Sequence, residues 1–235
     1  MLPETLKLRR QKLADSIDVP AILWSGCSSA RNFPANVFPF RASSHFLYFA
    51  GLPLENAAIR LKSGKLTLFL DESSQASALW HGASPTRDKI ATTIGADAAY
   101  PLSALKDWVT DAATVAVQDS QTRLEQARLL DRPIANPPSG IDLKLANAIV
   151  TLRLIHDDAA IAEIRKAIAV TVKAHQAGMS ATLNATVEAE VRAAMESVIM
   201  ANGMTCAYGS IVTVHGEVLH NNHYHHALQS GDLLL

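Results

Sequence analysis

The stretch of sequence that decides the fold spans residues 208–235 and reads YGSIVTVHGEVLHNNHYHHALQSGDLLL. Apolar, largely β-branched residues alternate over 211–214, and a second short run, Val218 and Leu219, follows Gly216. Such runs are typical of β-strands, and a glycine between two runs is typical of a turn or a bulge. The stretch therefore predicts strands near the end of the sequence.

A third apolar run, Leu233 to Leu235, comes after a turn signal at Ser230, Gly231 and Asp232. The backbone groups of a buried strand need hydrogen-bond partners on neighbouring strands. Because the sequence stops inside this run, we expect it to be the first part of a longer protein.

Histidines crowd the middle of the same stretch, which holds His215, His220, His223, His225 and His226. A polar loop between strands is one interpretation of this cluster. A metal site made by the histidines alone is another, since imidazole binds zinc or nickel, but no carboxylate or thiolate is interleaved to complete a tetrahedral set.

Composition indicates a folded protein with a sizeable core, because 49% of the 235 residues are apolar. The formal net charge of −1 gives no reason to expect nucleic acid or an anionic membrane as a partner. The first residues lack the apolar core of a signal peptide, and no window is long and apolar enough to span a bilayer. Cys27 and Cys206 lie far apart and form no CxxC pair, so we expect reduced thiols and a cytoplasmic location.

The first part of the chain alternates short strands with helices, which favours an α/β domain. Two alternating runs, 57–61 and 65–70, are joined through Ser63 and Gly64 and predict a β-hairpin. The aromatic run Phe46 to Phe49 predicts a core strand that Gly51 closes. Residues 131–140 contain three prolines and predict a domain boundary.

Beyond this boundary the pattern changes to long helices. Asp157 or Asp158 is expected to cap a helix whose apolar face carries Ile161, Ile164, Ile168 and Val172. A second helix is expected to open at Asn184 or Thr186 and to end at Asn202 and Gly203. Two helices followed by strands predict an α+β domain.

Several motifs now resemble one family, in the right order and spacing. They are Phe38-Pro39-Phe40-Arg41, Ser44-x-Phe46-x-Tyr48-x-x-Gly51, Trp80-x-Gly82, the helix opening at Arg153, Tyr208-x-x-Ile211-Val212, Leu219-His220 and Gly231-Asp232-Leu233. Together they are similar to the motifs of aminopeptidase P (Xaa-Pro aminopeptidase), a family of the creatinase/prolidase/aminopeptidase P superfamily. The sequence departs from the family pattern at His156-Asp157, where a lysine is expected, and at Glu217, which follows Gly216 without the family's asparagine.

This resemblance implies a creatinase-like α/β N-terminal domain over residues 1–135, followed over 136–235 by the first half of an α+β pita-bread metallopeptidase domain. It implies hydrolysis of the bond before a proline in second position, by a hydroxide that bridges two divalent ions, commonly manganese. The family's metal ligands fall beyond Leu235, so no residue of this chain is expected to bind metal. A homodimer or homotetramer is expected, with proline-containing peptides as substrates.

His220 is the residue that the resemblance marks as catalytic, in the role of holding the substrate carbonyl or the tetrahedral intermediate. It lies eleven residues before Gly231, in agreement with the family spacing, whereas His223 lies three residues too close. Trp80 and Tyr208 are expected to bind substrate, although both also fit roles as packing aromatics.

Other functions of the same fold stay open. A prolidase shares the fold and the metals but accepts only dipeptides, and creatinase uses the fold without metals. A pita-bread domain without metal ligands can also serve as a peptide-binding module. This interpretation is favoured if the 235 residues are the whole protein, because no five-ligand set can be assembled from residues 1–235. If they are only a part of it, we expect this segment alone to be an inactive fragment.

Overall fold

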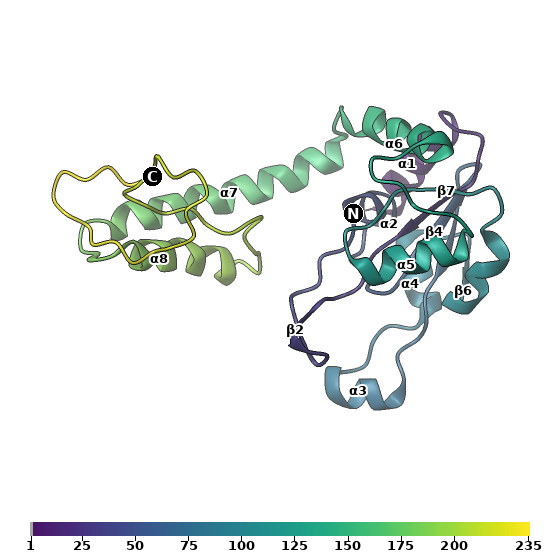
Figure 1. Cartoon of the computed structure of the whole chain (residues 1–235), viewed down its shortest axis with the longest axis horizontal. Coiled ribbons are helices and arrows are strands. Elements are labelled where there is room, and N and C mark those ends of the chain that lie inside the picture. Colours follow the sequence, from purple (N-terminus) through teal and green to yellow (C-terminus); the bar gives the residue numbers. More distant parts are fainter. Residues whose placement is uncertain (1) are drawn as a thin grey trace. The chain divides into compact units, whose positions relative to one another are not determined.

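The computed structural model describes residues 2–235 (Figure 1). The chain forms two compact units, one that ends at Ile155 and one from His156 to Leu235. The first unit is built on a five-stranded mixed sheet with the strand order β6-β5-β4-β1-β7. Its strands are β1 (Ala21–Trp24), β4 (Ala58–Lys62), β5 (Lys65–Phe69), β6 (Ala98–Tyr100) and β7 (Ala113–Thr114), and a separate hairpin is made by β2 (Ala30–Phe33) and β3 (Asn36–Val37).

Helices cover both faces of this sheet. One face packs against α1 (Pro3–Ala14), α2 (Ser44–Ala50), α4 (Arg87–Ile94) and α6 (Gly140–Arg153), and the other against the 3₁₀ helix η1 (Leu102–Trp108) and α5 (Ser120–Leu129). The inner strand β1, which lies between β4 and β7, is buried on both sides: Leu23 faces the first layer, while Ile22 and Trp24 face the second. This confirms the α/β class predicted for the first part of the chain.

The hairpin predicted between residues 57 and 70 is confirmed as β4 and β5, which pair antiparallel from Ala58 with Phe69 to Lys62 with Lys65. Ser63 and Gly64 form the two-residue turn, with φ angles of 51° and 75°. Positive φ at both central residues suits the twist of the strands and explains why a glycine occupies the second position.

The strand predicted at Phe46–Phe49 is wrong, because these residues belong to helix α2. Phe46, Phe49 and Ala50 are fully buried, and their three- and four-residue spacing places them on one helical face. Gly51 ends the segment as predicted, but as a helix cap with φ of 75°. The aromatic composition suggested a strand, whereas the buried residues recur at the three- and four-residue spacing of an α-helix.

Helix α6 belongs to the first unit. Leu145 and Ile149 are buried in its core, and the carboxylate of Asp142 accepts hydrogen bonds from Thr114 N (2.7 Å) and Arg132 Nη2 (2.8 Å). The first compact unit therefore ends later than the boundary predicted at 135/136. The assignment of residues 136–155 to the catalytic domain stays a prediction.

The second unit starts with two packed helices, α7 (Asp158–Ala181) and α8 (Glu188–Ala201). Asp157 caps α7 as predicted, since its side chain accepts a hydrogen bond from Ala160 N at 2.8 Å. The helices approach closely at Gly178, where an added Cβ would lie 2.7 Å from Met195 Cγ. The second helix starts slightly later than predicted, and Asn202 and Gly203 end it as predicted.

The apolar face predicted for α7 is not its buried face. Ile164, Ile168 and Val172 are 40 to 54% exposed, whereas the buried positions are Val170, Ala174 and Gly178. The small residues at 174 and 178 allow the close contact with α8, which bulky isoleucines would prevent.

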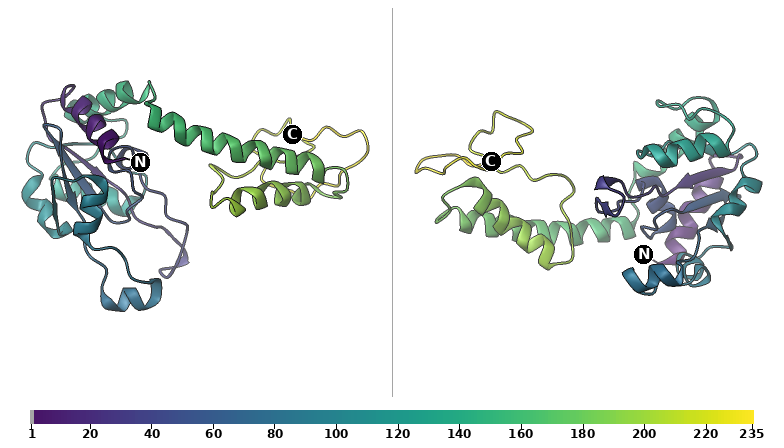
Figure 2. Two further views of the ribbon diagram at one scale, coloured as in Figure 1. Left: turned by 180° about the vertical axis from the view of Figure 1, so that it is seen from behind. Right: turned by 60° about the horizontal axis from the view of Figure 1, so that its bottom comes forward.

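The strands predicted within residues 208–235 are also wrong in detail, since this segment runs as an irregular chain beside α7 and α8 (Figure 2). Thr213 and Leu235 exchange two backbone hydrogen bonds of 3.1 and 2.9 Å, and Val187 forms an isolated bridge with Ala227. Alternating apolar residues form a strand only where a neighbouring strand supplies successive partners. In residues 2–235, the 208–235 segment has no such ladder.

Candidate functional site

Two of the predicted site residues, Tyr208 and His220, line the same open pocket of about 510 Å³ in the second unit. The pocket is also lined by Gly209, Ser210, Ile211, Asn221, Asn222 and Tyr224. Tyr208 is 76% exposed and His220 is also exposed, so neither is a core residue. An exposed imidazole and an exposed phenol that line one pocket can donate hydrogen bonds to a bound polar ligand and accept hydrogen bonds from it.

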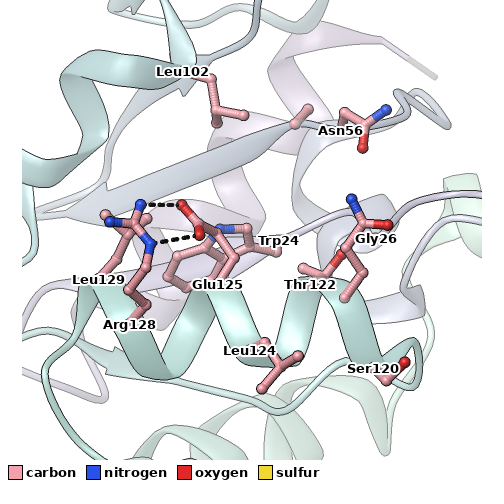
Figure 3. Close-up of a pocket in the computed structure, with 12 residues that line it drawn as sticks. Trp24, Gly26, Asn56, Leu102, Ser120, Thr122, Leu124, Glu125, Arg128 and Leu129 are labelled. Carbon is pink, nitrogen blue, oxygen red and sulfur yellow. Dashed lines mark hydrogen bonds and ion pairs between the residues drawn. The ribbon is translucent and has the colours of Figure 1, made fainter.

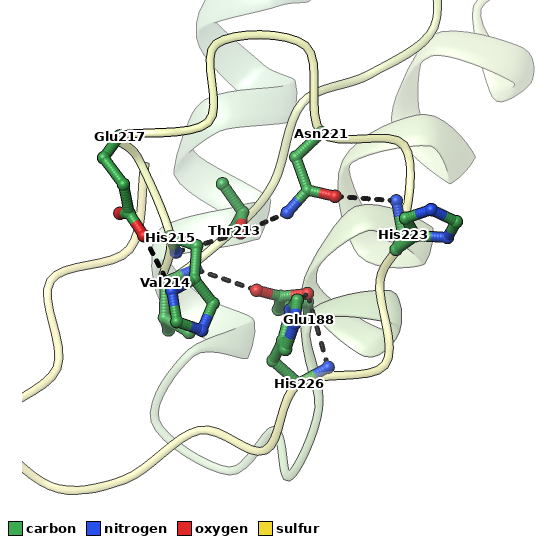
Figure 4. A network of polar contacts seen from close by, with 8 residues as sticks. All are labelled: Glu188, Thr213, Val214, His215, Glu217, Asn221, His223 and His226. Atoms are coloured by element: carbon green, nitrogen blue, oxygen red, sulfur yellow. Dashed lines mark hydrogen bonds and ion pairs between the residues drawn. The ribbon is translucent and has the colours of Figure 1, made fainter.

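A buried carboxylate holds the loop that carries His220. Glu188, the first residue of α8, is fully buried, and its Oε1 accepts a hydrogen bond from Val214 N at 2.8 Å (Figure 4). Its Oε2 accepts from His226 Nδ1 at 2.9 Å and from His226 N at 3.4 Å. The two ends of the 214–226 loop are thus bound to one side chain.

A second pair of buried side chains fixes the middle of this loop. Asn221 Nδ2 donates to Thr213 Oγ1 at 2.9 Å, and Asn221 Oδ1 accepts from His223 N at 2.9 Å. Thr213 Oγ1 also accepts from His215 N at 3.0 Å. Asn221 directly follows His220, so these bonds determine where the backbone of His220 lies.

On the other side of the pocket, Tyr224 and Ser210 contact α8 at Arg192 and Glu196, which lie one and two turns after Glu188. Arg192 lies over the ring of Tyr224, 4.2 Å from its centroid, and donates to Glu196 Oε1 at 2.8 Å. Glu196 in turn accepts from the hydroxyl of Ser210 at 2.6 Å, and the hydroxyl of Tyr224 donates to Ser210 O. Residues 188, 192 and 196 lie on one face of α8 at four-residue spacing, and this face contacts Ser210, Tyr224 and both ends of the 214–226 loop.

The environment of Glu188 favours its ionised form. Burial by itself raises the pKa of Glu188, but hydrogen bonds from Val214, His226 and Thr213 outweigh burial and leave this pKa below its ordinary value. The position in the first turn of α8 adds a favourable interaction with the helix dipole. Sequence reasoning missed Glu188, because an acidic residue in the first turn of a helix is common and signals only a helix start.

The histidine rings near this carboxylate form a contacting row. The ring centroids of His215 and His226 lie 4.6 Å apart and those of His225 and His226 4.4 Å apart, and His215 Nδ1 lies 3.0 Å from Glu217 Oε1. Among residues 2–235, however, no three histidine, cysteine or acidic side chains converge on a point where an ion could bind.

Trp80 lies in the first unit, on α3 (Gln75–His81), away from the sheet (Figure 1). It is 81% exposed and its neighbour Leu79 is 84% exposed, and no residue of α3 is buried. Trp80 is therefore not a packing residue of its own unit. Its role in binding substrate stays a prediction.

The first unit has a pocket of its own, of about 560 Å³, between α5 and the end of β1 (Figure 3). Trp24, Leu102 and Leu129 supply apolar walls. The one acidic side chain in the lining, Glu125, accepts two hydrogen bonds from Arg128, of 2.6 and 2.8 Å. No histidine or cysteine is among the described residues that line this pocket.

Fold and site together define a two-unit protein, in which an α/β unit is followed by a helical unit that presents an irregular loop on α8. Residues 6–119 match the model of the family "Aminopeptidase P, N-terminal domain". The whole chain superimposes on aminopeptidase P from E. coli (19% identity, TM-score 0.83, 58% of that chain covered) and on Pseudomonas aeruginosa aminopeptidase PepP (22%, 0.82, 57%).

Curated relatives agree with these matches. A "Probable Xaa-Pro aminopeptidase pepP" of Talaromyces stipitatus is 32% identical over 184 residues, which cover 74% of this chain and 38% of the relative. A "Probable Xaa-Pro aminopeptidase" of Tuber melanosporum is 28% identical over 167 residues, 70% of this chain and 34% of the relative.

Residues 6–119 thus belong to the aminopeptidase P N-terminal domain family, and the chain as a whole has the fold of aminopeptidase P. This confirms the resemblance and the fold class inferred from the motifs. The chain spans little more than a third of the length of these curated relatives.

Proposed function

We propose that this chain is part of a metallopeptidase that hydrolyses the bond between an N-terminal residue and a following proline. The observation that carries the proposal is the alignment of 74% of the chain with a relative named as an Xaa-Pro aminopeptidase. The match of all its residues to the aminopeptidase P fold supports it.

In this proposal His220 receives the substrate carbonyl. A proline in second position makes the scissile amide tertiary, so its nitrogen carries no hydrogen and the peptide is conformationally restricted. An exposed imidazole in an open pocket can donate a hydrogen bond to the carbonyl oxygen and to the oxyanion that develops from it. Tyr208, on the same pocket, would orient the peptide.

Two divalent ions, with manganese as our choice, would supply the nucleophilic hydroxide when bound. The side chains of residues 2–235 do not converge on a metal position. On the family resemblance, we assign the metal ligands to the part of the longer relatives that this chain does not span.

We further propose that the protein works in the cytoplasm as a homodimer or homotetramer. The aromatic side chain of Trp80, which is 81% exposed, would contact the substrate held by a neighbouring subunit. Residues 2–235 contain no helix long and apolar enough to cross a membrane. Size-exclusion chromatography with light scattering of the native product measures the oligomer directly, and a monomer would contradict this part of the proposal.

The test of the proposed function is a substrate panel assayed with the native gene product, after its mass has been determined. The panel compares Ala-Pro-Ala with Ala-Ala-Ala and with the dipeptide Ala-Pro, each with added manganese and with a chelator. Manganese-dependent release of alanine from Ala-Pro-Ala supports the aminopeptidase. Cleavage of Ala-Pro alone would identify a prolidase instead. Binding of Ala-Pro-Ala with no cleavage of any peptide would identify a metal-free binding module and contradict the peptidase.

A further inference from the structure

The carboxylate of Glu188 accepts hydrogen bonds from both ends of the loop that carries His220. An ionised carboxylate is a pure acceptor with about four lone-pair directions. Glu188 receives the two backbone N–H groups of Val214 and His226, the Nδ1 of His226 and the hydroxyl of Thr213. Its hydrogen-bonding capacity is thereby filled by the loop.

The hydrogen-bond directions in this network are determined by its chemistry. Thr213 Oγ1 accepts from Asn221 Nδ2 and His215 N, so its single proton is directed at Glu188. Because a carboxylate can only accept, His226 must carry a proton on Nδ1 (Figure 4). A neutral His226 therefore has a bare Nε2.

We propose that Glu188 is a positioning residue for His220. By accepting from Val214 and His226 it closes the 214–226 loop on α8, and through Thr213 and Asn221 it fixes the residue next to His220. The inference rests on the proposed function of His220, and it extends that function to a residue on a different element that does not line the pocket.

The substitution Glu188→Gln tests this proposal with little change in shape. The amide group keeps one acceptor oxygen but turns an NH₂ group toward loop donors, so at least one buried donor loses its partner. The matched control is Glu190→Gln, which removes the same charge from the same turn of α8. The carboxylate of Glu190 is bonded to Thr186 N at 2.6 Å and to no residue of the loop.

The readout is amide hydrogen exchange of the full chain, followed residue by residue by NMR. Losing one buried donor's partner corresponds to an acceleration of about tenfold. We expect this acceleration in Glu188→Gln at Val214, Asn221, His223 and His226, with exchange within α7 changed less than about twofold. We expect no such acceleration at these sites in Glu190→Gln. Equal exchange in both variants would overturn the proposal, and so would an acceleration spread evenly over both helices, because that pattern indicates a general loss of stability.

A measurement on the unmodified chain keeps the proposal testable even where Glu188→Gln does not fold. The ¹⁵N shifts of the His226 ring must show the proton on Nδ1 at neutral pH, and a proton on Nε2 alone would contradict the network. Neither measurement needs substrate, so both remain informative where the proposed peptidase activity fails.

In the native enzyme, the positioning role of Glu188 also predicts how kcat changes when Glu188 and His220 are replaced separately and together. A residue that acts through His220 has nothing left to position once His220 is replaced by alanine. Glu188→Gln is therefore expected to lower kcat in the wild-type background and to cost less than about twofold in the His220→Ala background. Equal losses in both backgrounds would show that Glu188 acts independently of His220.

Discussion

Arg10 offers a demanding test of how the first unit is held together. It is 1% exposed, and its guanidinium donates to Phe49 O (2.9 and 3.1 Å), Ile94 O (2.6 Å) and Gly95 O (2.7 Å). These carbonyls lie at the carboxyl ends of α2 and α4, where helices have unsatisfied acceptors and favour positive charge. Burial lowers the pKa of Arg10 to about 10, and Asp97 opposes this shift, so the side chain is still charged at neutral pH.

The substitution Arg10→Met keeps the apolar stem and removes all four donated bonds. Leaving three buried carbonyls without donors costs about 1 kcal/mol each at the lower end of measured values, or about 3 kcal/mol in total. For a protein of this length that corresponds to a decrease in Tm of roughly 6–12 °C. Arg10→Lys, which can reach fewer carbonyls, is expected to lie between Arg10→Met and the wild type.

Denaturant unfolding followed by the fluorescence of Trp24 and Trp108 measures this cost, since both indoles lie in the first unit. The matched control is Lys12→Met, which removes a positive charge from the exposed side of the same helix and is expected to change the free energy of unfolding by less than about 0.5 kcal/mol. An Arg10→Met variant as stable as Lys12→Met would refute the reasoning.

Three further predictions concern other parts of the chain. Asp142→Asn removes the charge that Arg132 contacts and should lower the free energy of unfolding of the first unit by about 2–3 kcal/mol, measured by the same fluorescence assay. An unchanged free energy of unfolding would show that the Asp142–Arg132 pair does not hold α6 in place. Gly51→Ala should cost more than about 1 kcal/mol, because φ is 75° and the new Cβ would lie 2.8 Å from Leu6 Cδ1; a neutral result in a thermal melt would contradict this. Because the pKa of Glu188 is lowered in the folded state, its ionised form stabilises the second unit above about pH 4.3, the ordinary glutamate value. This stabilisation is lost as the pH falls through the folded-state pKa. An NMR pH titration of the Val214 amide should detect this loss of stability in the wild type and not in Glu188→Gln.

Local signals in the sequence were sufficient where one element determines its own conformation. The β4–β5 hairpin follows from two alternating runs and a Ser63-Gly64 turn, and the start of α7 follows from Asp157 as its cap. The order and spacing of the motifs identified the family correctly, because they depend on the whole chain and not on any single helix or strand.

The misassigned elements depend on tertiary contacts that local patterns do not contain. Phe46 and Phe49 have strand-like composition, yet they are buried on one face of a helix. The isoleucines of α7 suggested a buried face, whereas the buried positions include Ala174 and Gly178, and Gly178 lies against Met195 of α8. Alternation within 208–235 suggested strands, but strands form only where partners lie alongside.

The family spacing selected His220, and the structure shows that His220 and Tyr208 line the same pocket. Their roles in catalysis and substrate binding stay predictions. The supporting residues Glu188, Arg192 and Glu196 escaped notice, because their four-residue spacing on a helix is common and becomes informative only when the loop is seen to bind to it.

The measurement that tests the central claim most directly is the rate of alanine release from Ala-Pro-Ala by the native gene product, compared between the wild type and His220→Ala. Loss of a donor to a developing oxyanion lowers kcat by about 10²–10³-fold, and we predict a loss of this size. His223→Ala serves as the control and should retain most of the activity. Equal rates in the wild type and His220→Ala, or a loss confined to His223→Ala, would contradict the account.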